Sequence, residues 1–345
     1  MNANPPNLFQ RGAEWLQKRF NSRALILMYH QVAEVDLDPW SLCVTPQHFA
    51  EHLTILQKYA NPISLQQLTQ AHREGKIPHR AVVITFDDGY ANNLHNAKPL
   101  LEKYNIPATV FITTGEVGQN REFWWDDLER VLLKPGRLPD KLCLEINGSS
   151  HSWELGAAVD YSEGEYRSDR DRNAWEGEPG SRLGFYYSVW EQLRPIPAKE
   201  RQQLQDKIIA WAGAEPTPRP SYRPLVAEEV RTLAQGGLVE IGAHTVTHPF
   251  LSAHDAEYQR DEIGQSKADL EALLDHPVNS FAYPFGDYAQ ETVPLIPEAG
   301  FNCACSTVQH TVWRNSDCYQ FPRFAVENWN GKEFEQRLFK WFYSG

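Results

Sequence analysis

Two short strings in this sequence combine residue types that hold metal ions and move protons. Residues 85–89 read Thr-Phe-Asp-Asp-Gly, and residues 244–248 read His-Thr-Val-Thr-His. Two histidines and a carboxylate form a ligand set of hydrolytic zinc sites, which keep a coordination position open for water. The second carboxylate of the Asp87–Asp88 pair is then free to act as a base, because successive side chains at a strand end point in different directions.

Each string directly follows a run of apolar and β-branched residues. These runs, residues 81–84 and 238–241, are typical of buried parallel strands. An Asp-Asp-Gly string alone is typical of a solvated turn, so the inference rests on the two strings and their strands together. Because α/β enzymes keep their chemistry at the carboxyl ends of their strands, we expect both strings to meet there. We predict that His244, His248 and one aspartate of the Asp87–Asp88 pair bind the metal, and that the other aspartate is the base.

The two strings resemble motifs of the polysaccharide deacetylases of carbohydrate esterase family 4, which carry a NodB-type homology domain. Residues 85–90 are similar to the first motif of that family and residues 244–248 to the second. Residues 281–286, Phe-Ala-Tyr-Pro-Phe-Gly, are similar to the third. The resemblance implies a distorted (β/α) barrel and a metal-dependent deacetylase, in which Asp88, His244 and His248 hold the metal and Asp87 is the base. The ligand types favour zinc as the metal.

The third motif also implies how the substrate is held. By resemblance, the backbone N–H of Phe285 stabilises the oxyanion that forms when water attacks the acetyl carbonyl. Pro284 and Gly286 would set the local backbone, although a turn after a strand is the simpler interpretation. We expect substrate contacts from Tyr283, Pro284 and Phe285, and from Trp125, which could stack on a sugar face. A tryptophan is more often a core residue, however, and Trp124, Trp313 and Trp329 carry the same ambiguity.

One departure from the family pattern concerns the residue that orients the base. Many members have an arginine at the start of the third motif, where this chain has Ala282. Arg323, within the string Phe-Pro-Arg-Phe, could supply the missing guanidinium and contact substrate. The alternative is that Arg323 is an ordinary surface residue.

A second departure concerns the general acid. The late Leu-His string that carries this acid in the family is absent, yet residues 25–30 read Leu-Ile-Leu-Met-Tyr-His at the opposite end of the chain. The first and last strands of a closed barrel are neighbours, so a circularly permuted chain keeps the strand in place. We therefore predict that His30 protonates the leaving amine. The alternative is that His30 merely caps a strand end.

Strands and helices alternate along the chain, which predicts parallel βαβ units. The expected strands cover residues 24–28, 81–86, 108–112, 238–242, 280–283 and 301–306. The expected helices cover residues 46–59, 92–104, 226–235 and 256–274, and a capping box at 64–67 opens another. The best fit is an α/β fold, a distorted barrel of about seven parallel strands that forms one domain over residues 1–345.

Residues 115–221 do not follow this alternation of strands and helices, which predicts a subdomain inserted into the barrel. We expect a helix to start near residue 123, a hairpin over 142–155 with an Asn-Gly turn, and helical structure over 195–211. Residues 162–182 are charged and poor in aliphatic side chains, which predicts a loop or mobile flap. The insertion could be a lid that selects substrate, a dimerisation element or plain decoration.

Composition and charge argue against some classes of binding partner. The net charge of −12 argues against nucleic acid or an acidic membrane surface. No apolar stretch reaches the ~20 residues of a membrane span. Residues 1–20 lack the apolar core of a signal peptide, and the five cysteines suit a reducing compartment, so we expect a cytoplasmic protein.

The predicted function is metal-dependent hydrolysis of an N-acetyl group on an amino sugar, within a polysaccharide, oligosaccharide or sugar precursor. Two alternatives stay open. One is C–N hydrolysis on a small non-sugar amide, and the other is a catalytically silent glycan-binding relative. An intact Asp87 favours the enzyme, because a binding protein needs no base.

Overall fold

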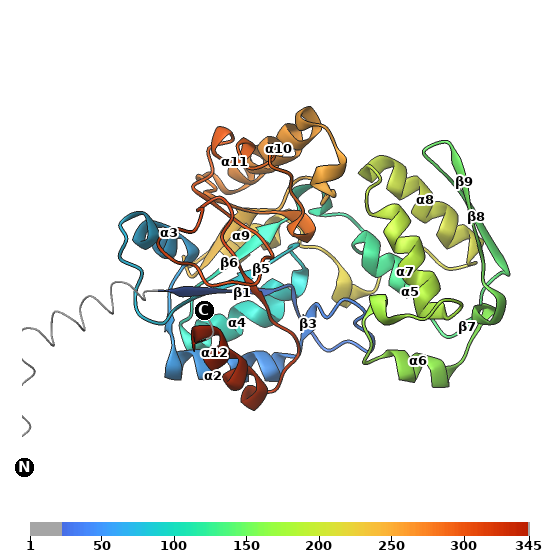
Figure 1. Cartoon of the computed structure of the whole chain (residues 1–345), viewed down its shortest axis with the longest axis horizontal. Helices are drawn as coiled ribbons and strands as arrows, with labels where there is room; N and C mark the ends of the chain where they lie inside the picture. The colour runs from blue at the N-terminus through green and yellow to red at the C-terminus, as the bar shows by residue number, and fades with distance from the viewer. Residues whose placement is uncertain (1–22, 344–345) are drawn as a thin grey trace, which may run out of the picture.

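A curved sheet of parallel strands forms the centre of the molecule, which we describe from a computed structural model (Figure 1). The structure describes residues 23–343, so the amino-terminal segment in which we expect no signal core lies outside the described residues. Neighbouring strands follow the order β13-β12-β11-β6-β5-β1-β14, and every pairing on this path is parallel. The path comprises β1 (Ala24–Tyr29), β5 (Ala81–Phe86), β6 (Ala108–Ile112), β11 (Val239–Ala243), β12 (Ser280–Ala282), β13 (Cys303–Cys305) and β14 (Phe324–Ala325), with β4 (Asn61–Pro62) beside β5.

These seven strands confirm the expected distorted barrel. Every residue of β1, β5 and β6 is buried, as their continuous apolar sequences predict. The chain itself spans the gap between the edge strands β13 and β14. Just before β14, Phe321 exchanges backbone hydrogen bonds of 2.8 Å with Ala304 and Ser306 beside β13. This closing segment also carries Arg323 into the barrel.

Helices cover the outer face of the sheet (Figure 1). Thr45 and the Ser64–Gln67 capping box start the first two helices as expected. The helix expected over 92–104 begins as a π-turn, Asn93–Ala97, before its regular part. The short strand β14 and the last helix, α12, were not predicted. The helices are α2 (Pro46–Tyr59), α3 (Leu65–Arg73), α4 (Lys98–Tyr104), α9 (Ala227–Ala234), α10 (Ala256–Leu274), α11 (Leu295–Glu298) and α12 (Gly331–Tyr343).

The insertion forms a second lobe, drawn at the right of Figure 1, and its apolar cluster also includes Leu37 and Tyr90 from outside the insertion. Its hairpin turns at Asn147–Gly148, as predicted. The loop predicted over 162–182 is wrong over residues 163–169, where Ser162 and Glu165 form a capping box that starts a helix, whereas residues 170–173 and 177–181 are irregular as predicted. The lobe comprises α5 (Trp124–Leu132), β7 (Gly136–Arg137), β8 (Lys141–Ile146), β9 (Ser149–Glu154), β10 (Asp160–Tyr161), α6 (Glu163–Asp169), α7 (Arg182–Leu193) and α8 (Ala198–Trp211).

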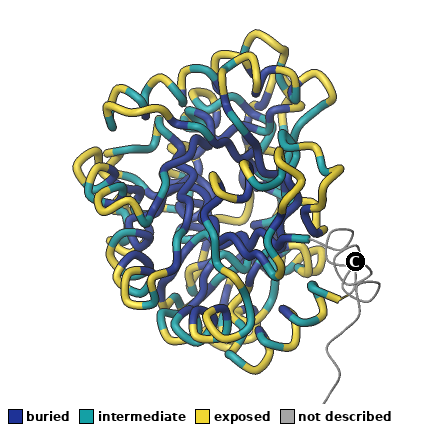
Figure 2. The backbone as a smooth tube through the Cα atoms, turned by 90° about the vertical axis from the view of Figure 1, so that its left-hand side faces the viewer, coloured by how far each residue is buried: buried dark blue, intermediate teal, exposed yellow. Residues whose placement is uncertain are grey.

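Burial follows this architecture. Figure 2 shows buried backbone concentrated in the interior and exposed backbone at the periphery. Within residues 23–343, no helix combines the length and apolar character that crossing a membrane requires. All five cysteines are free thiols, and Cys143 is exposed rather than part of the core.

Candidate active site

Three buried side chains from separate parts of the sequence converge at the carboxyl end of the sheet. Asp88 follows β5, His244 follows β11, and His248 lies in the loop beyond His244. Oδ1 of Asp88 lies 3.5 Å from Nε2 of His244 and 3.3 Å from Nε2 of His248. One potential ligand atom from each residue lies within 4.8 Å of the others. This spacing suits a single divalent cation.

The protonation states of this cluster also suit a cation. Nδ1 of His244 donates to the carbonyl of Ala282 at 2.8 Å, which leaves its Nε2 free as a ligand. Burial lowers the pKa of His248 to about 4, so its imidazole is neutral near pH 7. Burial alone would raise the pKa of Asp88, but the close contacts with the two histidines outweigh burial and hold that pKa below its ordinary value. A carboxylate and two neutral imidazoles are the forms that bind zinc.

The loop that carries His248 is held from both the barrel and the insertion. Glu262 of α10 accepts hydrogen bonds from the backbone N–H groups of Val246 at 2.9 Å and Thr247 at 2.8 Å. Arg201 of α8 donates to the carbonyl of Thr247 at 3.0 Å. His248 itself has a φ of 53°, a conformation that ordinary residues adopt only when neighbouring contacts enforce it. The sequence analysis missed Glu262 and Arg201, because no motif marks either residue.

Asp87 lies beside the cluster and forms a two-point ion pair with Arg323. Nη1 and Nη2 of Arg323 each donate to one carboxylate oxygen at 2.7 Å. Arg323 is fully buried and also donates to the carbonyl of Ser306 at 2.9 Å. Burial is the largest influence and favours a higher pKa for Asp87, but the charge and hydrogen bonds of Arg323, together with the nearby histidines, outweigh it and hold the pKa below its usual value. Arg323 lies behind Asp87, where it can orient the base. This position does not support the expected contact of Arg323 with substrate.

A cavity of about 660 Å³ opens above the cluster. His30 lines this cavity together with Asp87, Asp88 and both histidines. His30 lies close to Asp87 because Tyr29 pairs with Phe86, one residue earlier in each strand. The remaining wall is largely aromatic and contains Trp40, Trp125, Trp175, Trp190, Phe250 and Phe285.

The third motif contributes to this cavity only in part. Phe285 lines the cavity, and its ring packs against His248 at a centroid distance of 4.4 Å. Its φ of 57° again marks enforced backbone at the site. Tyr283 and Pro284 are buried outside the lining, and the Tyr283 hydroxyl donates to the Tyr319 carbonyl at 2.8 Å. Their position favours support of the loop over the substrate contact that we expected.

Comparison with known proteins places these residues in a family. The sequence model of the polysaccharide deacetylase family matches residues 74–175 and 204–304, more than half of the 345 residues. The chain belongs to the polysaccharide deacetylase family. The match covers Asp87, Asp88 and both histidines, whereas His30 and Arg323 lie outside it. The inference for His30 and Arg323 therefore rests on geometry, and the circular permutation stays a prediction.

Individual relatives agree with this assignment. A poly-beta-1,6-N-acetyl-D-glucosamine N-deacetylase of Staphylococcus aureus is 32% identical over 124 residues, which cover 32% of this chain and 43% of that protein. The chain thus spans about two fifths of the length of the curated relatives that it matches. The deacetylase PplD of Streptococcus pyogenes, solved with acetate, has a TM-score of 0.56 at 17% identity, covering 92% of this chain and 98% of that one. IcaB from Ammonifex degensii has a TM-score of 0.54 at 15% identity, covering 93% and 97%. These two structures show the fold.

Of the four tryptophans considered as sugar contacts from the sequence, Trp125 alone lines this cavity. Its ring packs 4.7 Å from that of His248, and its indole N–H donates to the Tyr90 hydroxyl at 2.8 Å. Tyr90 in turn donates to the Asp126 carboxylate at 2.7 Å, so a polar chain fixes the indole. The sequence analysis missed Trp40, Trp175 and Trp190, which the loop after β1 and the insertion bring to the cavity.

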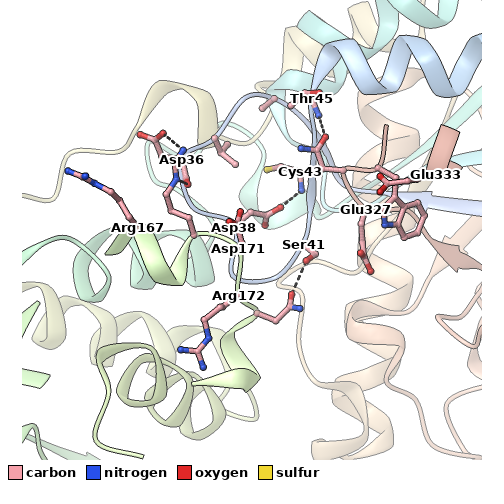
Figure 3. A pocket seen from close by; sticks show the side chains of 16 residues that line it. Asp36, Asp38, Ser41, Cys43, Thr45, Arg167, Asp171, Arg172, Glu327 and Glu333 are labelled. Atoms are coloured by element: carbon pink, nitrogen blue, oxygen red, sulfur yellow. Dashed lines mark hydrogen bonds and ion pairs between the residues drawn. The ribbon is translucent and has the colours of Figure 1, made fainter. Parts of the chain in front are cut away.

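A second cavity of about 990 Å³ lies on the other side of segment 38–43 (Figure 3). Trp40 and Leu42 line the first cavity, whereas Asp38, Ser41 and Cys43 line the second. The second cavity is the larger, but it contains none of the predicted ligands or catalytic residues. The wall of this second cavity is charged, and ion pairs such as that of Arg170 with Asp36 at 3.1 Å already neutralise some of these charges. The smaller cavity is therefore the candidate active site.

Proposed function

We propose that this chain is a zinc-dependent N-deacetylase that acts on amino sugars in a polysaccharide, oligosaccharide or sugar precursor. One observation carries the proposal. An ionised Asp87, oriented by Arg323, lies beside three potential metal ligands in one aromatic cavity. A glycan-binding protein without activity has no need for an oriented base there.

Asp88, His244 and His248 would hold the metal. When bound, a divalent cation supplies Lewis acidity toward the acetamide carbonyl and makes water easier to deprotonate. Two imidazole nitrogens and one carboxylate oxygen match zinc by ligand type.

The remaining steps belong to the protein's own residues. Asp87 accepts a proton from the water whose oxygen attacks the acetyl carbon, and Arg323 keeps the carboxylate ionised and in plane. The backbone N–H of Phe285 donates to the carbonyl oxygen as negative charge develops on it. His30 then donates a proton to the nitrogen as the C–N bond breaks, which yields acetate and a free amine.

The walls of the cavity suit a sugar ring. Aromatic side chains on several sides offer flat apolar faces, on which the C–H face of a pyranose can pack. The staphylococcal relative, named for N-acetylglucosamine polymers, supports the same substrate class. Because Trp125, Trp175 and Trp190 come from residues 115–221, we propose that the insertion is a wall or lid that selects substrate.

The decisive experiment measures acetate release from a panel of N-acetylated oligosaccharides and small non-sugar amides, with metal analysis of the same samples. We expect release from the sugars by the zinc-loaded protein, and none after removal of the metal with a chelator. An Asp88→Asn variant, which should lose the metal, serves as the matched control. Release from non-sugar amides alone would assign a different hydrolase, and no release from any compound would contradict the proposal.

A further inference from the structure

One charged side chain in the candidate cavity has no role in the mechanism above. Arg194 lies at the end of α7 and lines the cavity with Trp190 and Phe250. Its guanidinium carbon lies 5.3 Å from the ring centroid of Trp190 and 4.7 Å from that of Phe250. These distances allow cation–π contact with both rings.

Within residues 23–343, the Arg194 guanidinium forms neither a hydrogen bond nor an ion pair. Other arginines near the site are already engaged. Arg323 pairs with Asp87, and Arg201 donates to the carbonyls of Ile196 and Thr247. In the neighbouring cavity of Figure 3, Arg172 pairs with Asp169 and Glu178. The fixed donors of Arg194 therefore remain available to a ligand.

The carboxylates that line the cavity form no ion pair with Arg194. Asp287 also lines the cavity, but its two oxygens accept hydrogen bonds of 2.7 and 2.8 Å from the backbone and hydroxyl of Ser252. Asp87 is bound to Arg323, and Asp88 faces the two histidines. The donors of Arg194 are therefore left for a ligand that enters the cavity.

The aromatic neighbours hold the guanidinium in place without satisfying its donors. Trp190 is itself packed against Trp40 at a centroid distance of 4.3 Å and against Trp124 at 5.9 Å. A side chain held against such a rigid cluster loses less conformational entropy when it binds a ligand. An arginine held in this way is suited to a carboxylate or phosphate, which its planar fork can bind at two points.

We propose that Arg194 binds an anionic substituent of the substrate, a carboxylate or a phosphate group, and thereby makes the enzyme selective for acidic N-acetylated glycans. This inference rests on the proposed deacetylase function. The net charge of −12 opposes the approach of an anion at long range, but physiological salt screens charges beyond about 8 Å. The direct contact with Arg194 acts within that distance.

The test uses three matched substrates: a β-linked N-acetylglucosamine tetramer, the same tetramer with carboxymethyl groups, and the same tetramer with phosphate esters. For the wild type, we expect kcat/KM to be about 10- to 100-fold higher on at least one acidic tetramer than on the neutral one. Arg194→Met should abolish this preference, with a much larger loss on the acidic tetramers than on the neutral one, and Arg194→Lys should retain part of it. The carboxymethyl and phosphate arms show which anion the site prefers.

Arg337→Met is the matched control, because Arg337 also lies over a tryptophan, Trp329, but outside the candidate cavity. This variant removes one positive charge and should keep the wild-type preference. Equal wild-type activity on all three tetramers, or an equal loss on all three in Arg194→Met, would overturn the inference.

A second measurement separates this inference from the proposed function. Quenching of tryptophan fluorescence reports binding of the same tetramers without requiring that acetate is released. If no acetate is released, tighter binding of an acidic tetramer by the wild type than by Arg194→Met still supports the anion site. Equal binding by the two proteins overturns it.

Discussion

Arg323 and Asp87 lie 236 positions apart in the sequence, yet their side chains meet in two parallel hydrogen bonds of 2.7 Å. Both are at most 3% exposed. A pair of this geometry fixes the plane of the carboxylate as well as its charge. The segment that closes the barrel between β13 and β14 therefore sets the orientation of the candidate base.

Replacing Arg323 with methionine should destabilise the fold and impair catalysis together. The substitution leaves the buried Asp87 carboxylate unpaired, which should lower the free energy of unfolding by about 3–5 kcal/mol. Chemical denaturation measures this change. Adding Asp87→Asn to the same chain should recover much of the stability but none of the activity. Wild-type stability in the Arg323→Met variant would contradict the role of the pair.

The two adjacent aspartates should separate in their effects. Asp87→Asn should reduce turnover by roughly 10²–10⁴-fold with metal content nearly unchanged, because it removes only the base. Asp88→Asn should deplete the metal instead, since it removes a ligand. Metal analysis and acetate release on both variants check this division of labour. Identical metal binding by the two variants would show that it is wrong.

Much of the barrel could be predicted because its strands are buried on both faces. Residues 81–86 and 108–112 match β5 and β6 at both ends, as continuous apolar runs between turns allow. The two-residue strand β14 could not be predicted, because its pairing with β1 depends on the closing segment rather than on a local pattern. For the same reason, the sequence left open whether Arg323 lies beside the base, because Arg323 and its partner are far apart in the sequence.

The residues of the candidate site also include some that the sequence predicts and some that it does not. Asp87, Asp88 and His244 come immediately after strands, and His248 lies four residues beyond His244, so the strand pattern and the motif spacing predicted that they meet. Trp190 and Arg194 reach the cavity only through the packing of the insertion onto the barrel, which no local spacing reveals. The helix at Glu163–Asp169 was missed because the charged composition of this stretch favoured a loop, although Ser162 and Glu165 form a capping box there.

A buried histidine outside the active site should make stability depend on pH. His52 of α2 is fully buried, donates through Nε2 to the Trp329 carbonyl at 2.7 Å, and accepts from the Tyr29 hydroxyl at 3.2 Å. Burial lowers its pKa from 6.5 to about 4. As the pH falls from about 6.5 to about 4, the unfolded chain gains a proton that the folded chain does not. His52 should therefore cost stability over this interval, on the order of 3 kcal/mol in total.

Unfolding free energies measured between pH 4 and pH 7 test this expectation. His52→Gln should be less stable than the wild type at pH 7, because it alters a packed site, but should lose less stability on acidification. His276→Gln, at an exposed histidine, is the control and should follow the wild-type curve. Parallel curves for the wild type and His52→Gln would rule out this role of His52.

The last prediction assigns the general acid. His30 follows β1 directly, and its carbonyl accepts a hydrogen bond from Asn93 at 2.8 Å, which holds the end of the strand. β1 lies between β5 and β14, the elements that carry Asp87 and Arg323 to the site. His30 therefore opens into the candidate cavity beside the base, where it could protonate the nitrogen that leaves.

A change of leaving group isolates this role. An amide nitrogen must gain a proton as it leaves, whereas the phenolate of 4-nitrophenyl acetate departs without one. His30→Gln should therefore lower N-deacetylation by roughly 10²–10⁴-fold while largely sparing the ester, with metal content unchanged. Asp87→Asn is the control and should impair both reactions, because each needs the attacking water to lose a proton. Equal losses on amide and ester in His30→Gln would show that this histidine acts on binding or folding, and full activity on the amide would exclude it from the reaction.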